Sequence, residues 1–168
     1  MSVRRTVVVL AVVMALAAAG AALVWRARSG SGGACDDPIQ DPLDARSLQH
    51  SLPGAPPVTY GTEPPTSGPH QAGRLPGGVV GEPLAGPVQV GALEAGQVLL
   101  QHRDLAAPDL VTLESLGGPL VVVAPNPALP APVVASAWRT RQLCRAVDVD
   151  ALARFVKDHA GRDPAHHG

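Results

Sequence analysis

The most apolar stretch of the chain lies near its N-terminus. Residues 6–25, TVVVLAVVMALAAAGAALVW, are twenty positions without a charge, the length an α-helix needs to cross about 30 Å of hydrocarbon. Arg4 and Arg5 precede this stretch, and a basic segment before a long apolar one is typical of a secretory signal. We predict a cytoplasmic N-terminus at residues 1–5 and a transmembrane signal-anchor helix at residues 6–25, with everything that follows outside the cell membrane.

The residues after the apolar stretch bear on cleavage. Trp25, Arg26 and Arg28 interrupt the small residues that a signal peptidase requires, which favours an uncleaved, single-pass anchor. Lipidation of Cys35 is an alternative. It is disfavoured because Gly32 stands where a leucine is expected and because Cys35 lies about ten residues beyond the apolar stretch.

Glycine and proline dominate the next part of the chain. Residues 29–34, SGSGGA, are typical of a flexible tether, which we place at residues 26–34. From residue 36 to residue 87, recurrent proline and glycine disfavour helices and central strands. This Pro/Gly-rich lead-in is expected to be ordered by packing alone.

Regular hydrophobic patterning begins after residue 96. Four short aliphatic runs bounded by breakers predict strands at residues 97–102, 120–124, 133–138 and 143–147. The polar residues 139–142 separate the last two runs, which are therefore expected to form a hairpin.

Two segments show helical spacing. Leucines three residues apart predict a short helix over residues 108–116. Asp148 can cap a final helix whose apolar face carries Leu152, Phe155 and Val156 and which ends at Gly161. Together with the four strands, this order predicts an α+β fold: a single small domain at residues 35–162, with a mainly antiparallel sheet of about four strands and two short helices. Residues 163–168 are expected to be a disordered tail.

Composition narrows the functional classes. Thirteen basic and fourteen acidic residues give a net charge of -1, so the chain has no basic surface for a phosphate backbone and nucleic acid is excluded as a partner. Aromatic residues make up only 2% of the sequence, so the core is expected to be aliphatic.

The two cysteines, Cys35 and Cys144, both follow the predicted anchor. Thiols outside the membrane tend to be oxidised, and we predict a disulfide between them. It would close a loop of about a hundred residues, worth about 4 to 5 kcal/mol in chain entropy. The alternatives are a lipidated Cys35 and a soft metal ligand at Cys144. The chain has no Cys-x-x-Cys, so a thioredoxin-like redox role lacks its motif.

The candidate ligands are histidines in loop-rich stretches. His50 and His70 lie where binding groups are often carried, and imidazole binds copper and zinc well. His102 ends a predicted strand, where a polar residue at a sheet rim is also expected. His159 lies on a helix face and is interpreted as structural, whereas the terminal histidines, His166 and His167, are interpreted as solvated.

Nucleophile signals are weak. The chain has no G-x-S-x-G, and Ser67 has His70 three residues away but no evident third member of a triad. The four glutamates after residue 60 show no spacing that brings two carboxylates together.

Residues 60–70, YGTEPPTSGPH, carry a resemblance. The run PPTSGPH resembles the signature of an uncharacterised bacterial envelope family, catalogued as domain of unknown function 3105. The similarity continues in order through residues 90–98, 129–138, Cys144 and the last helix, and it covers most of residues 35–164. Members of this family are membrane-anchored or secreted proteins of this size, which is what the resemblance implies here.

The sequence departs from the family pattern at one motif. The family's second motif resembles V-H-x-L-E-H-G, and here Gly91 and Ala95 occupy the two histidine positions, while Leu93, Glu94 and Gly96 remain. If that histidine pair forms a site with the motif histidine, this chain retains His70 and Glu94 of it. His50 is a candidate match for a further family histidine.

Three hypotheses follow from these residues. The first is a non-enzymatic, membrane-anchored extracytoplasmic module that acts through binding, with a protein partner in the envelope. The second is an extracytoplasmic protein that binds copper or zinc through a partly degraded site of His50, His70, Glu94 and His102. An envelope hydrolase is the third and most remote. The metal hypothesis requires His70 and at least two of the other ligands around one cavity.

Overall fold

The computed structural model describes residues 33–162 and 164. The chain divides into two compact units, Met1–Gly33 and Ala34–Gly168, and the elements described here belong to the second. No helix among the described residues is long and apolar enough to cross a membrane. The predicted cytoplasmic N-terminus and anchor, most of the tether, and all of the predicted tail except Pro164 lie outside the described residues.

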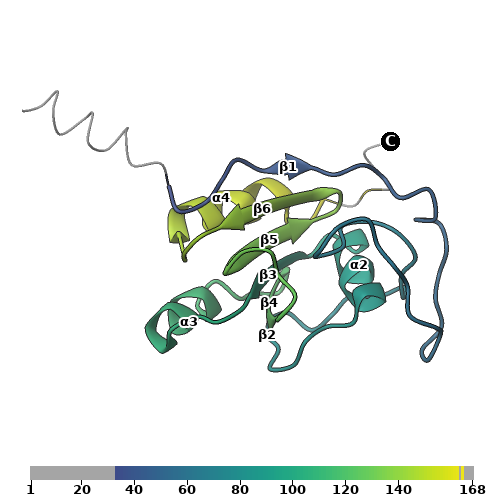
Figure 1. The fold of residues 1–168 in the computed structure, drawn as a ribbon, viewed down its shortest axis with the longest axis horizontal. Coiled ribbons are helices and arrows are strands. Elements are labelled where there is room, and N and C mark those ends of the chain that lie inside the picture. Colours follow the sequence, from purple (N-terminus) through teal and green to yellow (C-terminus); the bar gives the residue numbers. More distant parts are fainter. Residues whose placement is uncertain (1–32, 163, 165–168) are drawn as a thin grey trace, which may run out of the picture. The chain divides into compact units, whose positions relative to one another are not determined.

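The described residues form a small α+β domain with six strands and three helices (Figure 1). The strands are β1 (Ile39–Gln40), β2 (Gly78–Val79), β3 (Val98–His102), β4 (Val121–Pro125), β5 (Val133–Ala137) and β6 (Thr140–Cys144). The helices are α2 (Gly86–Glu94), α3 (Ala107–Glu114) and α4 (Val149–His159).

The six strands form one mixed sheet in the order β1-β6-β5-β3-β4-β2. The pairs of β3 with β5, β5 with β6, and β1 with β6 are antiparallel, whereas β3 with β4 and β2 with β4 are parallel. The prediction of a mainly antiparallel sheet of about four strands is therefore confirmed only in part, because six strands are described and two of the five pairs are parallel. A strand pattern does not show direction, and parallel neighbours need a crossover, which α3 supplies between β3 and β4.

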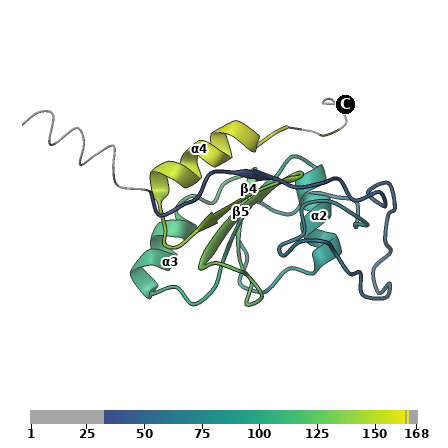
Figure 2. The ribbon, with the colours of Figure 1, turned by 45° about the horizontal axis from the view of Figure 1, so that its top comes forward.

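Two apolar clusters place the sheet between two layers. On one face, Val98 and Leu100 of β3 pack with Leu113 of α3 and with Leu152 and Phe155 of α4. On the other face, Leu99 of β3 and Val122 of β4 pack with Ala92 and Leu93 of α2. Alternate residues of β3 thus face opposite layers. Figure 2 shows α4 and α2 on different sides of the strands.

Helix α2 is absent from the predicted elements: two helices are predicted for the domain, and the described residues contain three. Its interior holds Gly91, and residues 89–93 are all buried, so it lacks the polar face that makes a helix visible in a sequence. Pro87 lies in its first turn, where the missing N–H is tolerated. The last two residues of the Pro/Gly-rich lead-in, Gly86 and Pro87, are therefore the first two residues of this helix.

The predicted last helix is confirmed. The side chain of Asp148 accepts a hydrogen bond from the backbone N–H of Ala151 at 3.0 Å, which satisfies one of the free donors of the first turn. The C-terminal end lies near Gly161, whose φ of 78° suits glycine.

The hairpin differs from its prediction by three residues. Strand β6 begins at Thr140, so the turn is Trp138 and Arg139, and residues 140–142 belong to the strand. These polar residues are tolerated because β6 has the short strand β1 as its outer neighbour. Arg141 uses this position to reach the buried Asp41, with its Nε 3.1 Å from Oδ1.

The lead-in is ordered by a few specific contacts. A disulfide joins Cys35 to the fully buried Cys144, as predicted, so neither cysteine is a free metal ligand. Further along, the buried amide side chain of Gln97 pairs with both the N–H and the C=O of Leu75, at 2.8 and 3.0 Å. The side chain takes the role of a neighbouring strand for this segment.

Candidate functional site

The PPTSGPH motif, residues 64–70, is buried throughout. Thr66 donates to Oδ2 of Asp41 at 2.9 Å and its carbonyl accepts from the N–H of Arg139 at the hairpin turn. The hydroxyl of Ser67 accepts from the N–H of Asp44 at 3.0 Å. Contacts with residues 41 and 44 and with the β5–β6 turn thus fix the motif, and with it the position of His70 at its end.

Two further motif positions, Gly68 and Pro69, lie against Tyr60. Gly68 has a φ of 124°, and a Cβ there would lie 3.1 Å from the ring of Tyr60, so only glycine fits. The hydroxyl of Tyr60 donates to the carbonyl of Pro69 at 2.6 Å. Burial raises the pKa of Tyr60 to about 12.

His70 is fully buried, and its surroundings decide which nitrogen carries the proton. Nδ1 lies 2.9 Å from the carbonyl oxygen of Gly68. A carbonyl can only accept, so Nδ1 donates. In the neutral ring this leaves the lone pair on Nε2, which is the arrangement of a histidine held ready to bind a metal.

The carboxylate of Glu94 stands against that lone pair. Nε2 of His70 lies 2.6 Å from Oε2 of Glu94, yet the two atoms are not aligned as a hydrogen bond, and Nε2 has no hydrogen-bond partner among the described residues. A lone pair facing a carboxylate oxygen at this distance is repulsive unless a cation, either a proton or a metal ion, lies between or beside them.

His50 completes the group. The backbones at His50 and His70 form an isolated parallel bridge, in which the N–H of His70 donates to the carbonyl of Gln49 at 3.0 Å. Their rings meet edge to face with centroids 4.8 Å apart. One ligand atom each from His50, His70 and Glu94 lie within 4.8 Å of one another. Three of the four predicted ligands therefore converge.

The spacing of these atoms suits an ion after a small adjustment. Two ligands of a tetrahedral zinc ion are about 3.3 Å apart, given bonds of about 2.0–2.1 Å. His70 is fixed by burial, whereas His50 is exposed and the side chain of Glu94 is 36% exposed. The two accessible ligands can move, and the buried one supplies the fixed point.

His102 does not belong to this group. It ends β3 opposite Val133 and Pro125, on the strand face that packs toward α3 and α4. Burial lowers the pKa of His102, with the charge of Glu114 opposing that shift. Three of the four candidate ligands therefore lie together and His102 lies apart. Along β3, His102 alternates in step with Val98 and Leu100, which face α3 and α4, whereas Glu94 belongs to α2 on the other face of the sheet.

Ser67 and His70 do not form a catalytic pair. The hydroxyl of Ser67 lies 3.0 Å from the N–H of Asp44 and 3.4 Å from the carbonyl of Pro42, and neither of these hydrogen bonds is to His70. Its environment is that of a structural serine.

The family comparison adds an independent finding. Residues 53–168 match the family described as Protein of unknown function (DUF3105). The chain belongs to this family. The match includes His70 and Glu94, whereas His50 lies three positions before its start. No curated protein and no solved structure matches the chain.

The resemblance implies a histidine at position 91, and the structure gives a steric reason for the glycine that stands there. A Cβ on Gly91 would overlap the backbone carbonyl oxygen of Gln71. Positions 91, 94 and 95 share one helical face because they are three and four residues apart, and this face packs on the chain just after His70. In this chain α2 approaches too closely for a histidine at position 91, while Glu94 keeps its place.

The site opens into a cavity that the sequence did not reveal. A cavity of about 570 Å³ is lined by Glu94 together with the apolar side chains of Leu43, Leu48 and Trp138. The ring of Trp138 lies edge to face with that of His70, with centroids 6.3 Å apart. The only advance signal was a tryptophan in a chain with almost no aromatic residues.

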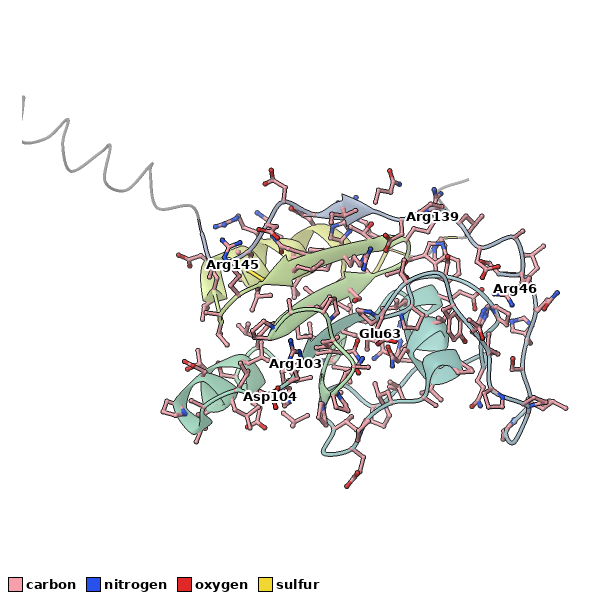
Figure 3. All side chains as sticks on the ribbon, in the orientation of Figure 1. Arg46, Glu63, Arg103, Asp104, Arg139 and Arg145 are labelled. Carbon is pink, nitrogen blue, oxygen red and sulfur yellow. A yellow bond between two sulfur atoms is a disulfide. The ribbon has the colours of Figure 1, made fainter. Side chains whose placement is uncertain are left out.

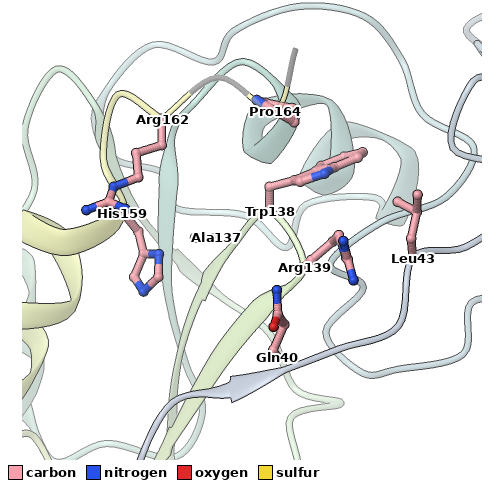
Figure 4. Close-up of a pocket in the computed structure, with 8 residues that line it drawn as sticks. All are labelled: Gln40, Leu43, Ala137, Trp138, Arg139, His159, Arg162 and Pro164. Carbon is pink, nitrogen blue, oxygen red and sulfur yellow. The ribbon is translucent and has the colours of Figure 1, made fainter. Parts of the chain in front are cut away.

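A second cavity of about 370 Å³ shares Leu43, Trp138 and Pro164 with the first. Arg139 and Arg162 also line it, and Figure 4 shows His159 beside Arg162. Burial and the charge of Arg162 lower the pKa of His159. Arg139 stands at the β5–β6 turn (Figure 3) with a φ of 56°, which is unusual for a residue other than glycine.

Proposed function

We propose that this member of the DUF3105 family is a membrane-anchored extracytoplasmic binding module whose ligand is a divalent transition-metal ion, zinc or copper. The observation that carries the proposal is the unsatisfied Nε2 of the buried His70. Its tautomer is set by Gly68, and the carboxylate of Glu94 lies 2.6 Å away.

Charge and ligand type favour this class of ion. Two neutral imidazoles and one carboxylate supply nitrogen and oxygen ligands, a set that zinc and copper accept and that hard ions such as calcium do not prefer. Glu94 would lower the net charge of a bound divalent ion to +1, so a partly buried ion is compensated by one protein charge.

The disulfide and the sequence support the location. Cys35 and Cys144 are joined, and such bonds persist mainly outside the cytosol. The predicted anchor at residues 6–25 precedes the disulfide by only about ten residues. A protein partner in the envelope that delivers or receives the ion fits this location.

The test is metal content by elemental mass spectrometry. The purified full chain, in detergent and with His166 and His167 replaced by alanine, is incubated with zinc or copper and then desalted. We expect about one ion per chain, retained in the control His102→Ala. We expect loss of the ion in Glu94→Gln, which is nearly isosteric, and in His50→Ala, which changes an exposed side chain.

His70→Ala alone would be ambiguous, because the imidazole is fully buried and its removal can disturb folding. The two partly exposed ligands avoid this problem. The proposal is overturned if the parent chain retains no metal, or if His50→Ala and Glu94→Gln retain as much metal as His102→Ala.

A further inference from the structure

The three converging ligands leave a metal ion incomplete. Four-coordinate ions with only three protein ligands keep one position for water or another donor. No fourth histidine, cysteine or carboxylate joins His50, His70 and Glu94 among the described residues. Asp44 lies in the same cavity, but its carboxylate is held by Arg46 at 2.7 Å, and that hydrogen bond lowers the pKa of Asp44.

One of the three ligands, Glu94, also lines a cavity of a size that suits a small molecule. Glu94 is both a ligand and part of the lining of the 570 Å³ cavity. Ligand sites are commonly about 300–1,000 Å³, apolar, with a few polar groups that fix orientation. This cavity has that composition, because most of its lining is apolar and its polar members are Asp44, Ser47 and Glu94.

Two leucines of the lining are unusually exposed. Leu48 is 92% exposed and Leu43 is 51% exposed, and both belong to the lead-in that also carries His50. Covering exposed leucine side chains with an apolar group removes their surface from water, which is favourable in free energy. They lie beside the half-buried face of Trp138, which offers a flat surface to the same occupant.

The charge at the site selects the head group of that occupant. A divalent ion with the carboxylate of Glu94 and two neutral imidazoles carries a net charge of +1, and Asp44 is neutralised by Arg46. A donor group with one negative charge brings the net charge of the site to zero. A neutral donor leaves the charge at +1, and a dianion makes it negative.

We propose that the cavity binds a small organic carboxylate with an apolar body: its carboxylate completes the coordination of the ion, and its body packs against Trp138, Leu43 and Leu48. This inference rests on the proposed metal site and adds the class of its ligand. No bond other than the coordination bond is made or broken.

The experiment uses cobalt(II) as a spectroscopic substitute in the full chain, with the two terminal histidines replaced as above. Cobalt loading is measured first. Acetate, benzoate and benzamide are then titrated while the visible absorption of the ion is followed. Acetate and benzoate share the carboxylate, whereas benzoate and benzamide share the aromatic ring. We expect benzoate to bind about tenfold more tightly than acetate, because its ring is buried, and benzamide to leave the spectrum unchanged.

Two variants decide whether the cavity is responsible. Leu48→Asp changes an exposed side chain and should reduce the preference for benzoate over acetate to less than about threefold, with cobalt loading intact. Arg162→Gln, in the neighbouring cavity only, should keep the full preference. Failure to load cobalt overturns the metal site itself. Loading with equal affinity for acetate and benzoate, or an undiminished preference in Leu48→Asp, overturns the cavity and leaves the metal site standing.

Discussion

Gly91 of helix α2 packs directly against the carbonyl oxygen of Gln71, the residue that follows the buried His70. This contact fixes the distance between the helix that carries Glu94 and the motif that carries His70. It also makes positions 91 and 95 differ in the room that they leave for a side chain. A side chain at position 91 would overlap backbone, whereas position 95 is half-buried. The resemblance implies a histidine at each of these two positions.

Histidine substitutions at positions 91 and 95 should therefore have different effects. Gly91→His is expected to destabilise the domain by several kcal/mol, because a side chain there overlaps backbone and the helix must move. Ala95→His adds a side chain on the face of Glu94 at a half-buried position, and it should raise zinc affinity about tenfold or more by supplying a fourth ligand. Thermal unfolding and competition with a zinc-sensitive dye measure the two effects. A stable Gly91→His, or an Ala95→His that binds zinc as weakly as the parent, would contradict this account.

Tyr60 should titrate abnormally. The chain has a single tyrosine, so its ionisation can be followed by absorbance near 295 nm without interference from another. Burial raises the pKa of Tyr60 to about 12, against about 10 in an unfolded chain. The folded pKa is the higher one, so the stabilisation from neutral Tyr60 is complete below about pH 10 and is lost as the pH rises toward about 12.

The measurement is a rapid pH jump that precedes alkaline unfolding. We expect a midpoint near 12 for the folded chain and near 10 in denaturant, with no transition in Tyr60→Phe. A folded midpoint near 10 would show that the hydroxyl of Tyr60 is not buried as described.

Loss of the disulfide should detach the start of the lead-in. The bond spans 109 residues, so the chain-entropy contribution is about 4 to 5 kcal/mol. Cys35→Ala with Cys144→Ala is expected to lower the free energy of unfolding by up to about this amount. The amide of Asp36, which donates to Leu143, should also exchange faster. Denaturant unfolding with and without a reductant measures the free energy of unfolding, and hydrogen exchange measures the Asp36 amide. The reductant should weaken the parent and leave the double variant unchanged, and a parent insensitive to reduction would contradict the prediction.

The predicted topology can be tested in cells. Alkaline phosphatase fused after Gly168 needs its own disulfides and is active only outside the cytosol. We expect activity from the full chain and none after deletion of residues 6–25. Activity without that segment, or inactivity with it, would contradict a signal-anchor role.

Much of the domain was readable from local patterns. The aliphatic runs of β3, β4 and β5 and the capped helix α4 have signals within a few residues, because side-chain period and capping chemistry are local properties. The disulfide followed from two cysteines and the expected compartment. The PPTSGPH motif was visible as a unit, and the family match over residues 53–168 confirms the resemblance.

Other features depended on contacts between distant segments. Strand direction at β3 and β4, the helix α2 and the true start of β6 were missed, because a buried helix shows no polar face and a polar strand shows no apolar run. The sequence by itself determined which residues could bind a metal: the imidazoles of His50, His70 and His102 and the carboxylate of Glu94. Only the tertiary structure selected three of them, because the strand pleat turns His102 to the other face, while the bridge at His50 and the close approach of α2 bring the remaining ligands to one point.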